Sequence, residues 1–494
     1  MSQKIPGDES ASFKDQEKQA KLNPRENLSL KESLKETRVQ NAAIAKLIDK
    51  MGANALIEEP ESPTKPKEHD FWKTQPVLLS SNSNQDKYDR ALKPDISLEK
   101  VSKEFIPISS EFYWCTVDIH KSSQMQELYT LLSHNYVEDS DELFRFHYSP
   151  EFLKWALDPP GQNPDWHIGL RSTDGSNKLM AFISGSEIEM KVNSVTKKMA
   201  EINFLCVNKN LRKQRLAPIL IQEVTRRVNL CNIFQAVYTA GVEIPTPISV
   251  CQYYHRPLNS KKLVDTGFSH LPPGVSLAKL VMHYRLLPES NSQMPGLRLM
   301  TEKDIPQVRK ILNKYLNART KMHQIFKSDE IIKHWLLPKK DVIYTYVVED
   351  INKTGKITDF FSFYLLPSLI LKNDKSSGLN TKKVNPNNLI NSAYLFYYGF
   401  NLEPASGVEI KDSNISYRDL NESMIKERLV LLMKNCLMIA KKENFDVFNC
   451  VKIQDNELFF DDLKFGSGDG HLHYYFYNWV IRDLKNRDIG LTML

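Results

Sequence analysis

A short basic segment follows an apolar stretch, and its residue types could bind phosphate. Residues 201–207 (EINFLCV) predict a strand, the following loop contains Arg212, Lys213 and Arg215, and a helix is expected to open at Leu216. Backbone N–H groups at a helix start lack intrahelical partners and carry partial positive charge, so a phosphate can be held there. The segment therefore predicts a site for a pyrophosphate-bearing ligand. A solvated basic turn is the simpler alternative for the same residues.

The apolar end of the chain is the second feature that could do chemistry. Residues 490–494 (GLTML) follow the aromatic run 474–479 (YYFYNW). Termini are usually disordered unless they pack, and so apolar a tail predicts packing. The α-carboxylate of Leu494 could then be a working base, because burial raises its pKa from an ordinary value of about 3.5. The alternative is a last strand that merely completes a sheet.

Composition narrows the class of protein. The chain has 494 residues, 41% hydrophobic content and a net charge of +6, which suits a globular protein with two or three domains. No apolar stretch is long enough to span a membrane, and the polar start is unlike a secretion signal. Six scattered cysteines favour free thiols over disulfides or zinc. Lysine and arginine are interleaved with acids, unlike a nucleic-acid footprint. No Ser/His/Asp arrangement or P-loop is evident.

Strand and helix patterns alternate after a polar arm. Residues 1–66 are rich in Lys, Glu, Asn and Ser and end in a Pro-rich linker. Order is expected from Phe71 and Trp72 onward. The periodicity then predicts strands over 112–117, 179–189 and 200–207, and helices over 122–136 and 217–230. An α/β chain follows, with a surface loop expected over 373–388.

The pattern restarts near Pro295. Residues 297–301, then Asp304 and Ile305, then a helix through Tyr315 repeat the earlier order of a strand at 114–117, Asp118 and Ile119, and a helix. A weak internal repeat is the simplest account, although any two strand-helix units look similar at this level.

Three segments resemble signatures of the eukaryotic glycylpeptide N-tetradecanoyltransferases (N-myristoyltransferases), of the fungal or protist type. They are residues 71–77 (FWKTQPV), 201–227 and 464–470 (KFGSGDG), in the order of the family. The similarity covers nearly everything from His69 to Leu494. The basic loop also resembles the R-x-x-G-x-A pyrophosphate loop of GNAT acetyltransferases, but Arg215 replaces the central glycine.

The resemblance implies an α/β fold of two fused GNAT-like (acyl-CoA N-acyltransferase) halves, which form a pseudo-twofold repeat around a saddle-shaped mixed sheet. It implies three parts: a mobile arm and linker over 1–66, an acyl-CoA-binding half over 67–290, and a peptide-binding half over 291–494 that supplies the catalytic C-terminus. The implied reaction transfers a tetradecanoyl group from myristoyl-CoA to an N-terminal glycine amine, by direct attack on the thioester.

The family's functional positions fall on residues of this chain. The resemblance implies that the Leu494 carboxylate is the base, that the backbone amides of Phe204 and Leu205 form an oxyanion hole, and that Asn203 and Thr239 line the path of the amine. Positions implied for myristoyl-CoA are His69, Asp70, Phe71, Trp72, Phe204, Leu205, Cys206, Val207, Arg212, Lys213, Gln214, Arg215, Leu216, Ala217 and Pro218. Positions implied for the peptide are Tyr136, Asp139, Asp141, Gly241, Tyr253, His255, Phe268, Ser368, Tyr397 and Asp469.

Each group also has a simpler interpretation. Phe71 and Trp72 could only anchor the arm, Asn203 and Thr239 could be polar strand ends, His255 could be structural, and the acidic run near Asp139 could be a solvated face. An N-acetyltransferase that uses a short acyl-CoA, or an acyl-CoA-binding module without activity, remain the rival functions.

The resemblance also defines the partners. It implies no cofactor, since myristoyl-CoA is a co-substrate, and peptide substrates with Ser or Thr and Lys downstream of the glycine. Burying about twelve methylenes at about 0.8 kcal/mol each makes tight acyl-CoA binding reasonable, but the chain length comes from the family. We expect a cytoplasmic monomer without nucleic acid or membrane span, with the arm a candidate ribosome contact.

Overall fold

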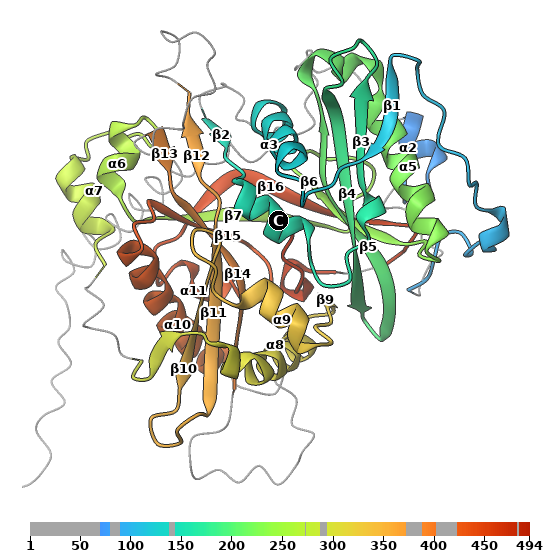
Figure 1. Ribbon diagram of the computed structural model, residues 1–494. Coiled ribbons are helices and arrows are strands. Elements are labelled where there is room, and N and C mark those ends of the chain that lie inside the picture. The colour runs from blue at the N-terminus through green and yellow to red at the C-terminus, as the bar shows by residue number, and fades with distance from the viewer. Residues whose placement is uncertain are drawn as a thin grey trace, which may run out of the picture.

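A computed structural model describes residues 70–79, 89–137, 144–271, 273–286, 294–371, 388–401, 422–481 and 484–494. The predicted arm over 1–66, His69, Asp139 and Asp141, and nearly all of the surface loop expected over 373–388 lie outside these residues. Helices and strands alternate along the described chain, as the sequence predicts (Figure 1).

The helices and strands have the following bounds. The helices are α2 (Asp70–Thr74), α3 (Ser122–Asn135), α4 (Pro150–Leu157), α5 (Leu216–Leu230), α6 (Ser260–Asp265), α7 (Leu277–His283), α8 (Ile305–Arg319), α9 (Asp329–Leu336), α10 (Glu422–Lys442) and α11 (Glu457–Phe460). The strands are β1 (Phe112–Thr116), β2 (Phe144–Phe146), β3 (His167–Ser172), β4 (Leu179–Val192), β5 (Val195–Val207), β6 (Ala236–Ala240), β7 (Ser249–Pro257), β8 (Leu297–Leu299), β9 (Met322–Gln324), β10 (Ile343–Glu349), β11 (Ile357–Leu365), β12 (Ser368–Ile370), β13 (Leu389–Ile390), β14 (Ser392–Phe400), β15 (Val447–Val451) and β16 (Gly466–Tyr477).

The periodicity located these elements well. The predicted strands over 112–117, 179–189 and 200–207 correspond to β1, β4 and β5, and the predicted helices correspond to α3 and α5. The expected restart is also present, because β8 leads through a capping box of Thr301 and Asp304 into α8.

One mixed sheet carries the fold, and its strand order reads almost the same from either edge. The order is β1-β3-β4-β5-β6-β16-β7-β15-β14-β11-β10-β8. From each edge inward, three antiparallel pairings are followed by one parallel pairing, β5 with β6 and β14 with β15, and then by antiparallel pairing to a central strand. Each parallel pair is connected through a long helix, α5 or α10. The predicted internal repeat is therefore confirmed.

The two halves exchange their central strands. β16, from the end of the chain, lies between β6 and β7 and pairs antiparallel with both. β7, from the first half, pairs with β15 of the second half. Figure 1 shows β7 and β16 running together between the two groups of strands. Neither half completes its own sheet without a strand from the other.

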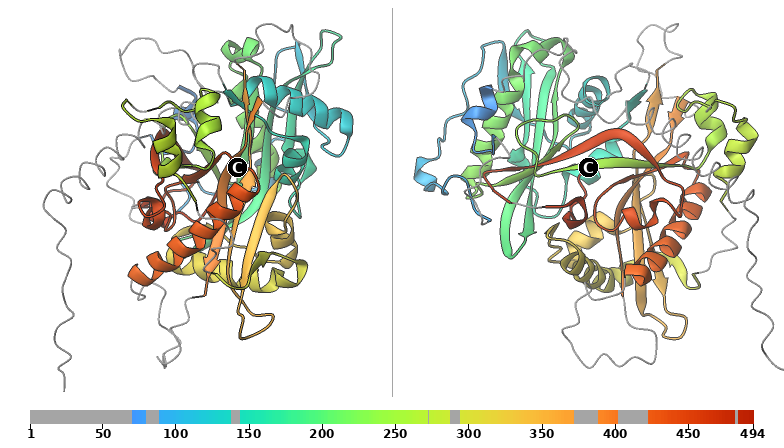
Figure 2. Two further views of the ribbon diagram at one scale, coloured as in Figure 1. Left: turned by 90° about the vertical axis from the view of Figure 1, so that its left-hand side faces the viewer. Right: turned by 180° about the vertical axis from the view of Figure 1, so that it is seen from behind.

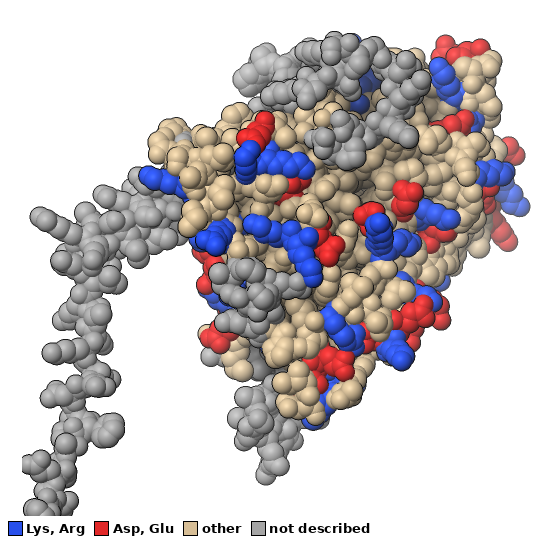
Figure 3. Space-filling view, turned by 60° about the vertical axis from the view of Figure 1, so that its left-hand side comes forward, with Lys and Arg blue, Asp and Glu red and all other residues tan. Residues whose placement is uncertain are grey.

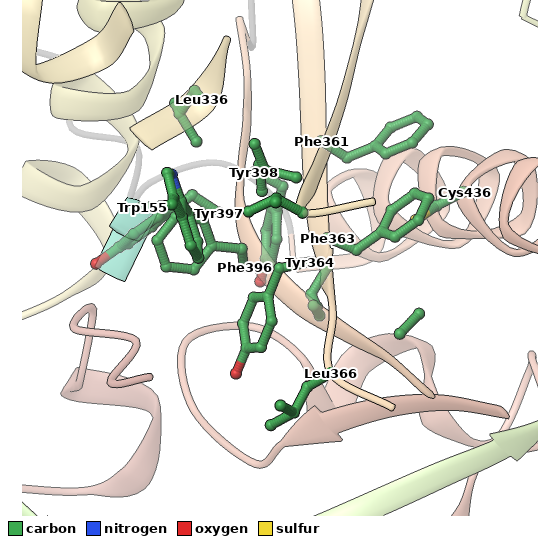
Figure 4. Packing of buried hydrophobic residues seen from close by; sticks show 14 of the residues in the cluster. Trp155, Leu336, Phe361, Phe363, Tyr364, Leu366, Phe396, Tyr397, Tyr398 and Cys436 are labelled. Atoms are coloured by element: carbon green, nitrogen blue, oxygen red, sulfur yellow. The ribbon is translucent and has the colours of Figure 1, made fainter. Parts of the chain in front are cut away.

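The main apolar core also spans both halves. Trp155 on α4 is fully buried; its ring lies 5.7 Å from that of Phe396 on β14, and its Nε1–H donates to the carbonyl of His334 at 3.0 Å. Figure 4 shows Trp155 beside Phe396 and Tyr397 in this cluster. Burying a side chain of this size contributes several kcal/mol, so the core also holds the two halves together.

The surface and the thiols agree with the composition. On the face shown in Figure 3, lysine and arginine are interspersed with aspartate and glutamate. The six cysteines are free thiols, as predicted. Among the helices of the described residues, none has the length and apolar character needed to cross a bilayer.

The last residues are packed, but they are not a final strand. Residues 490–494 form no strand, so the alternative of a tail that completes the sheet is wrong. Ile489, Leu491 and Met493 are buried in one apolar cluster with Met199 and Met322. The Gly490 N–H donates to the Met322 carbonyl at 2.6 Å. Both views in Figure 2 place the C-terminus near the middle of the molecule.

Gly490 lets the tail approach α8 closely. A Cβ at this position would lie 2.7 Å from Thr320 Oγ1 and 2.9 Å from Leu316 Cδ2. We predict that Gly490→Ala lowers the free energy of unfolding by about 1–3 kcal/mol, because overpacking forces the tail outward, as measured by urea denaturation. Gly185→Ala is the control, since the closest atom to its added methyl would be the movable Ile202 Cδ1 at 3.3 Å. Equal stability of the two variants would contradict this account.

Candidate active site

A cavity of about 230 Å³ draws its lining from both halves and collects many of the predicted site residues. The predicted residues that line it are Trp72, Tyr136, Asn203, Phe204, Leu205, Thr239, Gly241, Tyr253, His255 and Leu494. They come from segments more than 400 residues apart in the chain. The exchanged strands and the buried tail bring them together.

The cavity opens where β5 leaves β6. These parallel strands pair only over Ala200–Ile202 and Ala236–Tyr238. Beyond that point β6 continues along β16, where Thr239 pairs with Tyr474. Asn203 and Thr239 are the first residues past the paired stretch, so both face the opening between the strands.

A β-bulge in β5 lies at the same place. Asn203 pairs with Ser184 and Cys206 pairs with Phe182, which leaves Phe204 and Leu205 opposite Ile183 alone. Phe204 has a φ of 56°, in the left-handed region that a non-glycine residue rarely adopts. A bulge takes backbone groups out of the ladder and turns them elsewhere. The bulge is therefore able to direct backbone N–H groups at a bound ligand.

Tyr136 contacts this bulge. Burial raises the pKa of the Tyr136 phenol well above its usual value, and a hydrogen bond from the Phe204 backbone offsets part of that rise. The Tyr136 and Phe204 rings also lie 5.9 Å apart. The phenol thus marks where an oxygen acceptor of a ligand could meet the Phe204 amide.

The second half contains a matching bulge, and the tail occupies it. β14 pairs with β15 only over Ser392–Tyr394, and just beyond, Phe396 and Tyr397 bulge opposite Ser362 of β11. Thr492 Oγ1 donates to the Phe396 carbonyl at 3.1 Å, and the Thr492 N–H donates to the Tyr397 hydroxyl at 3.2 Å. The tail is therefore fixed two residues before its end.

That anchoring brings the chain end into the site. Leu494 is half-buried, packs against the main core and lines the same cavity as Asn203, Phe204 and Thr239. The Tyr474 hydroxyl donates to the Leu491 carbonyl at 2.9 Å, which fixes the backbone three residues before the chain end. A terminal carboxylate is thus held in a cavity whose other wall contains the β5 bulge.

The cavity has chemically distinct linings. Aliphatic side chains of β5 and α5, among them Ile202, Ile221, Val224 and Val228, line one part. Aromatic and polar side chains line another part: Tyr148, Tyr253, His255, Tyr364 and Tyr394. An apolar chain suits the first lining, and a peptide with polar groups suits the second.

Sequence reasoning missed several of these lining residues. Tyr364 and Tyr394 lie on the second-half strands β11 and β14, and their rings stack with centroids 5.4 Å apart. Tyr148 lies just before α4, and Phe234 and Gln235 lie just before β6. Alternating aromatic residues in the strands were visible, but an apolar core predicts the same pattern.

The basic loop has the predicted form. Residues Lys209–Gln214 form a 3-10 helix between β5 and α5, and Arg212, Lys213, Gln214 and Arg215 are exposed. Arg215 has a φ of 55° immediately before α5. The residue at the usual glycine position of this loop therefore keeps the conformation that favours glycine. Arg212, Lys213 and Arg215 are thus exposed directly before the N-terminus of α5.

The aromatic pair at the start of the described chain does more than anchor it. Trp72 stacks on Tyr238 with centroids 5.9 Å apart and lines the cavity. Phe71 packs edge-on against Trp72 at 5.1 Å. Nearby, the Tyr477 hydroxyl donates to Gln75 Oε1 at 2.9 Å. These contacts hold the segment around Trp72 against the cavity, beside Tyr238 of β6.

Other predicted residues lie outside the lining. Phe268 is buried against Phe144, with ring centroids 5.0 Å apart, and Ser368 is buried on β12. Tyr397 supports the tail, and Asp469 is an exposed residue of β16. Cys206, Val207, Leu216, Ala217 and Pro218, with exposed Asp70, belong to the strand, loop and helices beside the cavity. Within the described residues no group of His, Cys, Asp or Glu could hold a metal ion.

Comparison with known proteins identifies the family of the chain. The family model "Myristoyl-CoA:protein N-myristoyltransferase, N-terminal domain" matches residues 91–251, and the model of the C-terminal domain matches residues 265–490. The chain belongs to the myristoyl-CoA:protein N-myristoyltransferase family. Membership confirms the predicted fold class and makes the protein an acyltransferase.

Relatives of this N-myristoyltransferase chain are similar over most of their length. A glycylpeptide N-tetradecanoyltransferase of Schizosaccharomyces pombe is 41% identical over 465 residues, covering 92% of this chain and 93% of the relative. One of Aspergillus fumigatus is 44% identical over 414 residues, covering 83% and 77%. A crystal structure of Saccharomyces cerevisiae N-myristoyltransferase with bound myristoyl-CoA has a TM-score of 0.76 and 37% identity, covering 87% of this chain and all of that one.

The left-handed conformation of Arg215 makes a testable prediction. Arg215→Gly should leave the free energy of unfolding unchanged or raise it, because glycine adopts positive φ without strain. Arg215→Val should lower it by about 1–2 kcal/mol, because a β-branched residue is disfavoured there. Urea unfolding of the two variants measures the difference. Equal stabilities would mean that the backbone at this position is relaxed.

Proposed function

We propose that the protein transfers a tetradecanoyl group from myristoyl-CoA to the N-terminal glycine amine of substrate proteins. The observation that supports this most is that the half-buried Leu494 and the β5 bulge line one cavity. The apolar lining from β5 and α5 would take the acyl chain. The exposed basic loop and the start of α5 would hold the phosphates of CoA.

The proposed chemistry needs a base and an oxyanion hole. A glycine amine enters mainly protonated at neutral pH, and the Leu494 carboxylate takes the proton that blocks its lone pair. The neutral amine attacks the thioester carbonyl, forming the C–N bond. The amides of Phe204 and Leu205 then stabilise the negative oxygen; one such donor is typically worth about 3 to 4 kcal/mol.

Collapse of this intermediate completes the reaction. The C–S bond breaks, the amine nitrogen loses a second proton, and the CoA thiolate takes up a proton to leave as the thiol. Asn203 and Thr239, at the opening between β5 and β6, would orient the amine between the carboxylate and the thioester.

The peptide would bind along the aromatic lining. Tyr253 and His255 of β7 lie in the cavity, and His255 Nδ1 lies 2.8 Å from Asn449 Oδ1, which fixes the ring. The acidic segment with Asp139 and Asp141 would pair with a lysine downstream of the substrate glycine. In this scheme residues 67–290 bind acyl-CoA, and residues 291–494 bind peptide and supply the base.

Mass spectrometry tests the substrate assignment. A Gly-Xaa-Xaa-Xaa-Ser-Lys peptide and its counterpart with a leading alanine are incubated with the protein and acyl-CoAs of different lengths. We expect acylation of the glycine peptide only, mainly from the tetradecanoyl donor. Preference for a short donor would support the N-acetyltransferase rival, and retention of acyl-CoA without transfer would support a binding module.

The role of the C-terminal carboxylate has its own test. One glycine added after Leu494 moves the carboxylate out of place, and we predict that kcat falls by about 100-fold or more while acyl-CoA binding is unchanged. Leu494→Met is the matched control, since it keeps the carboxylate and an apolar side chain, and its kcat should stay within a few-fold of the parent. Single-turnover transfer measures kcat, and acyl-CoA binding is measured separately. Full activity of the extended chain would remove Leu494 from the mechanism.

A further inference from the structure

Glu201 is a half-buried acid beside the site, and the proposed reaction does not use it. It lies on β5 two residues before Asn203, and the Asn203 Nδ2 donates to Glu201 Oε1 at 2.8 Å. Within the described residues Glu201 has no ion pair with a lysine or arginine. Burial raises its pKa to about 7, and the Asn203 hydrogen bond opposes this. A carboxyl group kept without a cation in such a place is costly.

The surroundings of Glu201 connect it to the reacting groups. Strand alternation places Met199, Glu201 and Asn203 on one face of β5, and Met199 packs with Leu491 and Met493 of the tail. On β14, the charge of Glu201 contributes to raising the pKa of the Tyr397 phenol. Ser186 of β4 and Val237 of β6 are its strand partners. Leu494 lines the same cavity as Asn203.

The repeat shows that the fold does not need this acid. Asn203 immediately precedes the β5 bulge, as Leu395 precedes the β14 bulge. Two residues before each lie Glu201 in the first half and Ala393 in the second. The bulge in β14 therefore forms without a carboxylate at this position. The acid is present only in the first half, where the separation of β5 from β6 opens into the cavity.

Hydrogen-bond chemistry gives the acid a role. An ionised carboxylate only accepts hydrogen bonds, so it requires the NH₂ group of the Asn203 amide to face it. The Asn203 oxygen must then point away from Glu201. A neutral primary amine carries N–H donors, and an amide oxygen presented to it would orient its lone pair toward the thioester.

We propose that Glu201 is a positioning residue of the transfer reaction, whose carboxylate fixes the Asn203 amide so that its oxygen accepts a hydrogen bond from the substrate glycine amine. Protonated Glu201 can also donate, so the amide orientation is no longer specified and transfer slows. This role rests on the proposed function and concerns one step of it, the orientation of the substrate amine.

The test compares pH profiles of kcat/KM for the wild type, Glu201→Gln, Asn203→Ala and the double variant, with a glycine peptide. At pH 8, Glu201→Gln should lower kcat/KM about tenfold without changing acyl-CoA affinity. Below pH 7, Glu201→Gln should fall about tenfold per pH unit, because only the peptide amine titrates. The wild type should fall more steeply and lose its tenfold advantage over Glu201→Gln by about pH 5.5, because protonated Glu201, like glutamine, no longer specifies the orientation of the Asn203 amide. The double variant should match Asn203→Ala alone, because Glu201 acts through Asn203.

Stability separates positioning from a structural role. Since the pKa of Glu201 is raised in the folded protein, ionisation costs stability as pH rises from its unfolded value toward 7. Glu201→Gln should therefore raise the melting temperature at pH 8 more than at pH 5, whereas loss of a merely structural residue would lower it at both. Glu187→Gln is the control: this carboxylate pairs with Lys198 on the surface, and its removal should leave the rate and the pH profile unchanged.

The outcomes are distinct. An active wild type with an unchanged pH slope in Glu201→Gln, or with effects that add to those of Asn203→Ala, would overturn the role of Glu201. A wild type that acylates no glycine peptide would instead overturn the proposed function.

Discussion

The structure depends on one constraint of β-sheets: where a strand leaves its parallel neighbour, its backbone groups need other partners. This happens twice, in β5 and in β14, and each strand bulges at the point of departure. In the second half the chain's own tail supplies partners, through Thr492 and Phe396. In the first half the opening is left as a cavity. The β14 bulge is thus filled by the tail and the β5 bulge is left open, and this arrangement places the chain end opposite the open bulge.

The exchanged strands keep the two bulges in register. Because β16 lies between β6 and β7, a displacement of one half would break backbone hydrogen bonds of the other. The shared core around Trp155 adds to this coupling. A site divided between halves is rigid only if the halves cannot slide, and here they cannot do so without disrupting the sheet.

Most of the helices and strands near the site could be predicted from the sequence, and there are physical reasons why the remaining features could not. Local periodicity located β1, β4, β5, α3 and α5, and the apolar tail indicated packing. The motifs led to the bulge at Phe204 and to the basic loop. The positions of Tyr364 and Tyr394 in the cavity wall could not be predicted, because the sequence pattern of an aromatic residue in a strand is the same for a core and for a cavity wall. The peptide role that the resemblance implies for Phe268 stays a prediction, since its ring packs against Phe144 and it is not among the residues that line the cavity. The exchange of β7 and β16 was also hidden, since strand pairing across 200 residues leaves no local signal.

The position of β16 has a consequence for synthesis of the chain. Thr239 of β6 pairs with Tyr474 of β16. The strand that pairs with both β6 and β7 is therefore synthesised more than 200 residues after them. Pairing over such a separation is slow, because a long loop must close before any contact rewards it. Until then the nascent first half has two unpaired strand edges, the type of surface on which chains aggregate. Completion of this sheet is therefore post-translational, because β16 is made near the end of the chain.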